Sequence, residues 1–237
     1  MLPHIATNVT AIRNRIAAAA IRSGRAGNAV RLVAVTKYAG VEEIRALVAA
    51  GCTDLGESRP QQLWERAAAL ADLPICWHMI GHLQRNKAER TLSLVSMLHS
   101  IDSLRLAEAV DSAAGALGRR MAVLLEVNIS GEPAKHGFSP EEIEPALPTL
   151  IALKNIEIRG LMCIAGLEGG DDGARRDFAA LRVLRDRLQA VSAGGLRLDE
   201  LSMGMSGDYE LAIEEGATIV RIGSALFEKP EGNRSEI

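Results

Sequence analysis

Aromatic residues, cysteines and long apolar runs are all scarce in this sequence. Phe, Trp and Tyr make up 3% of the 237 residues, so Tyr38 and Tyr209 are the only phenolic side chains that could act as acids or bases. The three cysteines lie far apart and form no C-x-x-C pair, which argues against a disulfide framework and favours reduced thiols. The apolar runs are too short and too interrupted to span a bilayer, which needs about 20 residues.

A strong charge of one sign and an N-terminal targeting pattern are missing as well. With 27 basic and 30 acidic residues the formal net charge is -3, so the charge does not favour nucleic acid or a membrane as a partner. The start, MLPHIATNVTAIRNRI, has neither the charged region nor the apolar region of a signal peptide. We therefore expect a cytoplasmic protein that binds neither nucleic acid nor membrane.

Short apolar segments alternate regularly with helical ones along the chain. Eight segments have the composition of buried strands, at residues 29–37, 52–57, 74–81, 94–102, 120–129, 156–165, 196–204 and 218–227. A helical stretch separates each segment from the next, and a further helix over about residues 5–22 precedes them, with Ile5, Val9, Ile12 and Ile16 at helical spacing. Strict alternation predicts parallel strands with helices covering the outside.

The number of these units and the chain length favour one closed barrel. Eight units in 237 residues fit a single (β/α)8 TIM-type barrel, for which about 250 residues is typical. The competing architecture, an open doubly wound sheet, usually carries G-x-G-x-x-G after its first strand, and TKYAGVEE does not match that pattern. No linker, repeat or change of composition divides the chain. We expect one domain over residues 1–237, with an irregular tail from about Glu228.

Polar residues gather where the predicted strands end, which is where a β/α barrel places its active site. Lys37 closes the apolar run LVAVT, where burying an ammonium ion would be costly. The alternatives are a solvated lysine just past the strand and a lysine that is used chemically. After the last two strands, GMSGD and IGSA offer glycines, N–H groups and the hydroxyls of Ser206 and Ser224, which suit a phosphate but also suit ordinary tight turns.

Two further groups have both a structural and a functional interpretation. Arg221 lies inside the apolar run TIVRIG, so it needs either an internal carboxylate such as Glu126 or Asp54 or a polar atom of a bound ligand. His78 and His82 are four residues apart, but a glycine and the end of the strand interrupt a continuous helix there. No H-E-x-x-H motif accompanies them. We expect histidines that hydrogen-bond in a polar barrel mouth, and no metal.

A lysine after the first strand and a phosphate cradle after the last two would lie on neighbouring strands of a closed barrel. One phosphorylated carbonyl compound could therefore reach both. Pyridoxal 5′-phosphate (PLP) fits, because its aldehyde forms a Schiff base with lysine, its phosphate accepts N–H hydrogen bonds and its ring nitrogen needs a defined partner. A ketose phosphate held by the lysine, as in an aldolase, fits equally, and spacing alone does not separate the two.

Seven segments, taken in order, closely resemble the YggS/PROSC family of pyridoxal phosphate homeostasis proteins. They are LVAVTKYAG, DLGESRPQQL, WHMIGHLQRNK, HSIDSLRLAEAV, VLLEVNISGEPAKHGF, RGLMCIA and LSMGMSGDYELAIEEGATIVRIGSALF, and the resemblance extends to about Phe227. The segments IGHLQRNK and LSMGMSGD with VRIGSALF are the most specific. The fold of that family resembles the N-terminal barrel domain of alanine racemase, a fold-type III PLP protein, in agreement with the barrel expected above.

The resemblance implies which residues hold the cofactor. Lys37 would carry PLP as a Schiff base, and Arg221 would lie near the ring nitrogen. The other cofactor-binding residues that it implies, with phosphate contacts from the last three, are Ser58, His78, Met203, Ser206, Gly223 and Ser224. The family usually has G-E-N-R where this sequence has GESR, so Ser58 lacks the amide donor of the asparagine that it replaces. The ending LFEKPEG also replaces the usual IFG.

The resemblance implies a carrier of PLP rather than an efficient enzyme. A racemase needs an acid or base on each face of the bound amino acid, and Lys37 can serve only one face. In alanine racemase the opposite base is a tyrosine from a second domain, and we expect no such domain after the eighth strand here. We expect a monomer that buffers PLP and supplies it to PLP-dependent apo-enzymes. The alternative is a low-activity, PLP-dependent amino-acid racemase.

Overall fold

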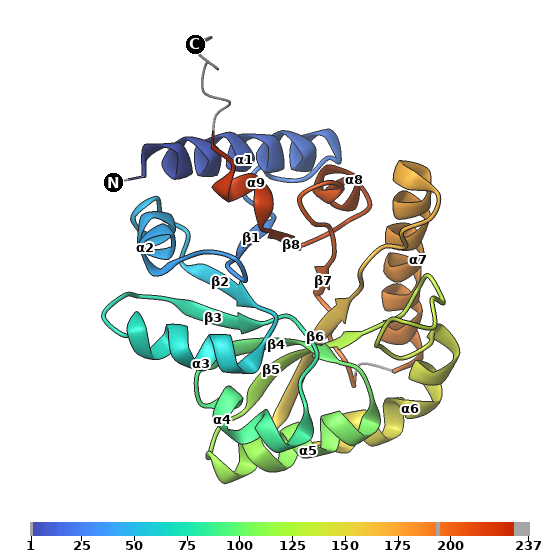
Figure 1. The fold of residues 1–237 in the computed structure, drawn as a ribbon. Coiled ribbons are helices and arrows are strands. Elements are labelled where there is room, and N and C mark those ends of the chain that lie inside the picture. The colour runs from blue at the N-terminus through green and yellow to red at the C-terminus, as the bar shows by residue number, and fades with distance from the viewer. Residues whose placement is uncertain (1, 193–194, 230–237) are drawn as a thin grey trace, which may run out of the picture.

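The eight predicted strands form a closed barrel in the computed structural model, which describes residues 2–192 and 195–229. All eight run parallel, each pairs with the next along the chain, and β8 pairs with β1 to close the barrel (Figure 1). In chain order the strands are β1 (Arg31–Val35), β2 (Asp54–Glu57), β3 (Cys76–Met79), β4 (Val95–Ile101), β5 (Met121–Glu126), β6 (Ile156–Met162), β7 (Glu200–Ser202) and β8 (Ile219–Ile222). The predicted barrel is confirmed, and the open-sheet alternative is wrong.

Helices cover the outside of the barrel (Figure 1). In chain order they are α1 (Pro3–Arg22), α2 (Val41–Ala49), α3 (Pro60–Ala69), α4 (Ala88–Leu92) after a 3-10 turn at Arg85–Lys87, α5 (Leu104–Ala116), α6 (Pro140–Ala152), α7 (Gly170–Val191), α8 (Tyr209–Glu214) and α9 (Ser224–Phe227). The extra N-terminal helix, α1, packs against α2, α8 and α9. Over the described ranges, no helix has the length and apolar character that crossing a membrane requires.

Local sequence signals explain where the helices at the barrel mouth begin. Ser103 Oγ accepts a hydrogen bond from the backbone of the first turn of α5, so Ser103 is the cap of this helix. Ser139 and Glu142 form a reciprocal capping box at the start of α6. Prolines occupy the first turns of α1, α3 and α6, where their missing N–H costs no intrahelical bond. The caps of α5 and α6 also fix the loops that enter these helices from β4 and β5.

The strands separate two apolar layers. Side chains that face into the barrel form a small cluster of Val33, Met97, Leu124, Met162 and Ile219. The alternate residues face the helices and join the main hydrophobic core, as the period of two along a strand requires. Val33 faces inward, and residues two apart on a strand share a face, so Val35 at the end of β1 also lies on the interior face. The alternation alone could not decide this.

Several strands are shorter than predicted. β1 ends at Val35, two residues before Lys37, and β8 ends at Ile222. The segment predicted to complete the eighth strand instead forms the short helix α9, whose Leu226 N donates to the Gly223 carbonyl over 2.9 Å. This prediction was wrong because an apolar composition at the start of a short amphipathic helix looks like the end of a buried strand. Of the predicted irregular tail, only residues 228–229 are described, and the rest lies outside the described residues.

Candidate functional site

Lys37 lies on a short turn that follows β1 at the mouth of the barrel. Within the turn, Ala39 N donates to the Thr36 carbonyl over 2.8 Å. Thr36 Oγ1 donates to the buried carboxylate of Glu57, the last residue of β2. Arg66 from α3 forms an ion pair with the same carboxylate and donates to the Ala39 carbonyl over 2.8 Å. Two neighbouring elements therefore fix the backbone that carries the lysine.

The side chain of Lys37 is exposed, in contrast to the fixed turn beneath it. Its Nζ lies 5.0 Å from the ring centroid of Tyr38, which is itself 89% exposed. Among the residues that the structure describes, Lys37 forms no hydrogen bond or ion pair through its side chain. The strand has therefore ended before the lysine, and the amine is solvated but free to react. Exposure alone leaves the chemical role of Lys37 a prediction.

The loops after β7 and β8 lie beside this turn, because β8 pairs with β1. A Cβ atom on Gly223 would lie 3.4 Å from the Val35 Cβ, so the β8 loop approaches the end of β1 closely. Gly223 N donates to Ser206 Oγ over 3.2 Å, which joins the two loops. Gly204 has a φ of 93°, and a Cβ there would lie 2.6 Å from the Ala212 Cβ, so this turn requires glycine. GMSGD and IGSA are thus adjacent in space, next to the turn of Lys37.

Arg221 points into the barrel from β8 and is buried. Its Nη1 donates to Ser202 Oγ over 2.7 Å and its Nη2 donates to the Cys163 carbonyl over 2.9 Å. Burial lowers the pKa of the guanidinium, but an arginine side chain keeps its charge in proteins. Neither Glu126 nor Asp54, the carboxylates considered as internal partners, forms an ion pair with Arg221 within the described residues. The guanidinium therefore keeps N–H donors for a ligand.

A chain of hydrogen bonds runs from Arg221 through the barrel interior to Asp54 at the start of β2. Ser202 Oγ, which accepts from Arg221, lies 2.9 Å from His99 Nδ1. His99 Nε2 lies 2.9 Å from His78 Nδ1. His78 Nε2 in turn lies 3.1 Å from Asp54 Oδ1. His78 is therefore buried inside the barrel, and the expectation that it hydrogen-bonds at the mouth was wrong.

The two charged ends of this hydrogen-bond chain limit the directions that its hydrogen bonds can take. Arg221 can only donate, and the hydrogen bond from His78 lowers the pKa of Asp54, so that carboxylate is ionised and accepts. Burial lowers the pKa of His99 well below its usual range, so its imidazole is neutral. When the His78 ring carries a single proton, the chain is complete only if both rings carry that proton on Nε2. The Ser202 hydroxyl then donates to His99 Nδ1.

We expect His78 and His99 to be Nε2–H tautomers, which long-range proton–nitrogen NMR of histidine-labelled protein measures directly. In Asp54→Asn the side-chain amide can donate to the His78 ring, and this would reverse the chain and shift the rings toward the Nδ1–H tautomer. His4→Gln, His82→Gln and His136→Gln, all outside this hydrogen-bond chain, identify the three remaining signals and should leave these two tautomers unchanged. Nδ1–H tautomers in the native protein would contradict the assignment.

Glu126 is a further polar residue at the mouth, where it ends β5 beside a pocket of about 240 Å³. Burial, together with the nearby charge of Asp102, raises the pKa of Glu126 to about 7. Its carboxylate forms no hydrogen bond with any of the described residues. From the sequence, Glu126 was considered only as a partner for Arg221. The pattern that singled out Lys37, a polar residue closing an apolar strand, would also have found it.

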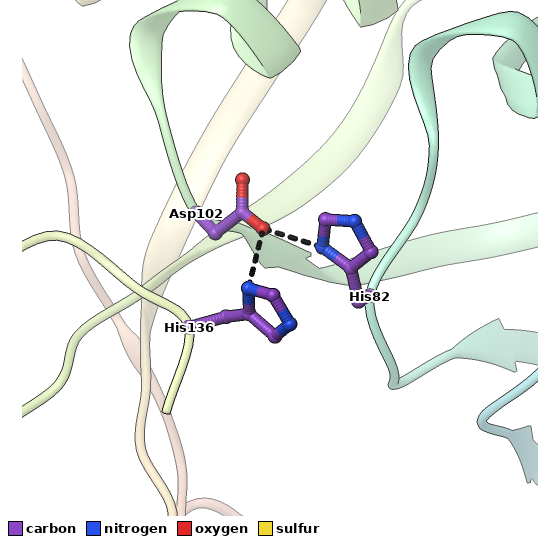
Figure 2. Close-up of side chains that lie close together, drawn as sticks. All are labelled: His82, Asp102 and His136. Carbon is purple, nitrogen blue, oxygen red and sulfur yellow. Dashed lines mark hydrogen bonds and ion pairs between the residues drawn. The ribbon is translucent and has the colours of Figure 1, made fainter. Parts of the chain in front are cut away.

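Three side chains from separate loops meet at the rim of the mouth (Figure 2). His82 Nδ1 donates to Asp102 Oδ2 over 2.7 Å, and His136 Nδ1 lies 4.0 Å from the same oxygen. The structure thus separates His78, in the interior, from His82, at the rim. His136 was missed in the sequence, because no local spacing relates it to the other two.

The other predicted cofactor residues lie in different surroundings. Ser224 is exposed at the first position of α9, next to the loop that holds Ser206 and Gly223. Ser58 is partly buried just after β2, and its hydroxyl forms no hydrogen bond within the described residues. Met203 is completely buried in the main core. The structure therefore brings the predicted phosphate residues together but does not place Met203 at the open mouth.

The closed β/α barrel, with a lysine after β1 and glycine loops after β7 and β8, belongs to the class of barrels built like the N-terminal domain of alanine racemase. The family model for the alanine racemase N-terminal domain matches residues 5–229. In agreement, the chain is similar in fold to alanine racemase of Clostridium difficile, with a TM-score of 0.76 at 16% identity. That likeness covers 98% of this chain but 58% of the racemase chain, and it shows the fold alone.

Within this class, the chain belongs to the family of pyridoxal phosphate homeostasis proteins. It is 39% identical over 216 residues to such a protein from Aquifex aeolicus, covering 91% of this chain and 94% of the relative. A relative of the same name from Deinococcus radiodurans is 43% identical, with 93% and 99% of the two chains covered. The structure of PipY from Synechococcus elongatus with PLP bound has a TM-score of 0.84 at 37% identity, covering 94% of this chain and 100% of PipY.

Proposed function

We propose that this protein binds PLP at the barrel mouth, with Lys37 holding it as a Schiff base, and that it buffers the cofactor and supplies it to apo-enzymes. The observation that carries the proposal is the adjacency of an exposed lysine on a fixed turn to two glycine loops joined by the Gly223–Ser206 hydrogen bond. The PLP-bound PipY structure and the names of the relatives support the same cofactor. They give no support to the ketose phosphate alternative.

The chemistry of the donor set fits PLP. The hydroxyls of Ser206 and Ser224 would donate to the phosphate, which accepts charge-assisted hydrogen bonds. The Gly223 N–H, which here donates to Ser206 Oγ, would turn to the phosphate when it binds. Arg221 would donate one of its remaining N–H groups to the ring nitrogen. When bound, PLP supplies an electrophilic carbonyl carbon and an electron sink. Lys37 would anchor it by condensing with that carbonyl, and release would require water or a competing amine to free the lysine.

The same residues favour a carrier over an enzyme. A guanidinium donating to the ring nitrogen leaves that nitrogen unprotonated, which weakens the electron sink that amino-acid chemistry needs. Neither tyrosine is suited to act as a second base opposite Lys37. The ring of Tyr38 is exposed to solvent and lies beside the Lys37 side chain, on the same side as the lysine that it would have to oppose. The ring of Tyr209 is buried, with its centroid 5.3 Å from the guanidinium of Arg15 in α1.

One observation favours a second candidate function, a low-activity racemase. Glu126 is a buried carboxyl at the mouth, and burial raises its pKa to about 7, close to the value that suits proton transfer at neutral pH. If its carboxylate reached the Cα of a bound amino acid, it could act on the face opposite Lys37. This candidate and the carrier differ in a single measurable property, the rate of proton exchange at Cα.

We expect holo-protein incubated with L-alanine or L-serine in deuterium oxide to exchange the Cα proton slowly, if at all. Proton NMR of the amino acid measures this exchange. The same holo-protein mixed with a PLP-dependent apo-enzyme should restore that enzyme's activity. Turnover above about 1 s⁻¹, the low end for ordinary enzymes, would contradict the carrier function. Loss of such turnover in Glu126→Gln would then assign the second base.

A further inference from the structure

His82, Asp102 and His136 converge from three loops at one edge of the barrel mouth. His82 follows β3, Asp102 follows β4, and His136 lies in the loop between β5 and α6. One ligand atom of each, a ring nitrogen or a carboxylate oxygen, lies within 4.8 Å of those of the other two. Figure 2 shows both imidazoles directed at the same side of the carboxylate. These are the ligand types that first-row transition metals prefer when thiolates are absent.

Only one of the two imidazole rings forms a hydrogen bond with Asp102. His82 Nδ1 donates to Asp102 Oδ2 over 2.7 Å, but His136 Nδ1 is 4.0 Å from that oxygen, too far for a hydrogen bond. The two rings stack with centroids 4.2 Å apart at an interplanar angle of 15°. His136 Nδ1 therefore forms no hydrogen bond with any of the described residues, although it faces the carboxylate.

The carboxylate between the rings is oriented by its own neighbours. Ser103 Oγ donates to Asp102 Oδ1 over 3.0 Å, while its lone pairs also cap α5. This leaves Oδ2, the oxygen that faces both rings, as the ligand atom. Such second contacts to a ligating carboxylate are typical of metal sites, since they fix the direction of its lone pairs.

Lys135, which precedes His136 in the same loop, directs its ammonium group away from the cluster. Lys135 Nζ lies 3.0 Å from Glu132 Oε1 and donates to the carbonyls of Ile164 and Ala165 over 3.3 and 2.8 Å. Its charge is therefore compensated on the other side of the loop. The side chain of Asp102 is 10% exposed and those of His82 and His136 are 44% and 59% exposed, so the rings can adjust to an incoming ion.

We propose that His82, Asp102 and His136 form a binding site for a divalent transition-metal ion of the zinc, nickel or cobalt type, ligated by the two Nδ1 atoms and Asp102 Oδ2. Tetrahedral coordination at about 2.0–2.1 Å places neighbouring ligand atoms roughly 3.4 Å apart. The present separations from Oδ2, 2.7 and 4.0 Å, lie on either side of that value. Small side-chain rotations close the site once the His82 proton moves from Nδ1 to Nε2 or to solvent, which frees the Nδ1 lone pair for the ion.

Three protein ligands leave one coordination position open. A hollow of about 590 Å³ lies beside the site, lined by His82 and Asp102 and also by Arg85 and Arg105. Two arginines in that hollow favour water or a small anion as the fourth ligand. A metal here would tie the loops after β3, β4 and β5 together at the mouth.

The test is metal titration of tag-free, full-length protein, with and without PLP, using Co²⁺ as the probe. We expect one Co²⁺ per chain, visible ligand-field absorption bands and displacement by Zn²⁺. His82→Gln, Asp102→Asn and His136→Gln should each weaken binding by at least about tenfold. Circular dichroism should show that the histidine variants fold normally, since both rings are exposed.

Two control variants exclude other ligands. His4→Gln removes a histidine in α1, and Cys76→Ser removes an exposed thiol; both should leave Co²⁺ binding unchanged. The site is overturned if His136→Gln binds Co²⁺ as tightly as the native protein, if Cys76→Ser loses it, or if less than one ion binds per chain. PLP content, measured on the same samples, is an independent quantity, so a failure of the metal site and a failure of PLP binding are distinguished.

Discussion

Replacing Lys37 with alanine is expected to abolish covalent attachment of PLP completely. The amine is the group that condenses with the cofactor's aldehyde, and no other residue can supply it from the turn after β1. Borohydride reduction of native holo-protein should fix one PLP per chain on the peptide that contains Lys37, as mass spectrometry of the digested protein would show. The Lys37→Ala protein should carry no fixed PLP and should lack the visible absorption band of the native protein.

Lys135 offers a matched control for this experiment, because it is a lysine that borders a pocket at the barrel mouth. Its ammonium group is held by Glu132 and by backbone carbonyls, so it is not available as an amine for the aldehyde. Lys135→Ala should keep the full amount of fixed cofactor. If reduction instead labels Lys135 in the native protein, the assignment of Lys37 is wrong.

Noncovalent binding should survive the loss of Lys37. The phosphate contacts proposed for Ser206, Ser224 and Gly223 do not involve the amine, and each charge-assisted hydroxyl contact contributes about 1.5–3 kcal/mol. Lys37→Ala should therefore still bind PLP reversibly, as equilibrium dialysis would measure. Adding Ser206→Ala should weaken that residual binding by roughly tenfold or more. Pyridoxal, which lacks the phosphate, should bind poorly to both proteins.

Replacing Arg66 with methionine is expected to destabilise the folded protein by about 3–5 kcal/mol, the cost of leaving a buried partner unpaired. Glu57 is 0% exposed, and among the described residues Arg66 is the only cation that pairs with it. The substitution also removes the donor to the Ala39 carbonyl. Urea unfolding at neutral pH measures the loss. The turn that carries Lys37 should loosen, so PLP should bind more weakly as well.

The pH dependence of this loss has a defined sign. Burial raises the pKa of Glu57, while Thr36 and Arg66 lower it, so removing Arg66 raises it further. Between the unfolded and the folded pKa the native state then binds more protons than the unfolded state, and stability falls as pH rises. The destabilisation by Arg66→Met should therefore be larger at pH 8 than at about pH 5. At lower pH, protonation of Glu57 neutralises the unpaired charge.

Two comparisons separate the buried pair from general effects of losing an arginine. Arg45 forms an exposed ion pair with Asp72 over 2.7 Å, so Arg45→Met should destabilise the protein much less than Arg66→Met does. Adding Glu57→Gln to Arg66→Met removes the buried charge and should recover part of the stability. An Arg66→Met protein no less stable than Arg45→Met would show that Glu57 does not depend on its partner.

The order and type of the elements were readable from the sequence because they are encoded locally. Short apolar segments predicted eight strands, and Ile5, Val9, Ile12 and Ile16 at helical spacing predicted the N-terminal helix that the structure confirms as α1. Alternation of strand and helix then implied a parallel barrel. In such a barrel the strand ends share one face, so Lys37, GMSGD and IGSA could be predicted to lie near one another.

Contacts between distant residues were not readable in the same way. The chain from Asp54 through His78, His99 and Ser202 to Arg221 joins five strands, and its members look like isolated polar residues in apolar runs. Only the inward alternation of every strand, together with the staggered register between strands, brings them into contact. The prediction for His78 failed for this reason.

The architecture, the expected place of the site at one end of the barrel and the family resemblance that points to PLP could all be inferred from the sequence. The tertiary structure alone decided which polar residues are buried. It raises the pKa of Glu126 to about 7 by burying it beside Asp102, and it sets Lys37 on a turn held by Glu57 and Arg66. Local propensity acts over a few residues, whereas burial and hydrogen-bond partnership depend on side chains that the closed barrel brings together from different strands.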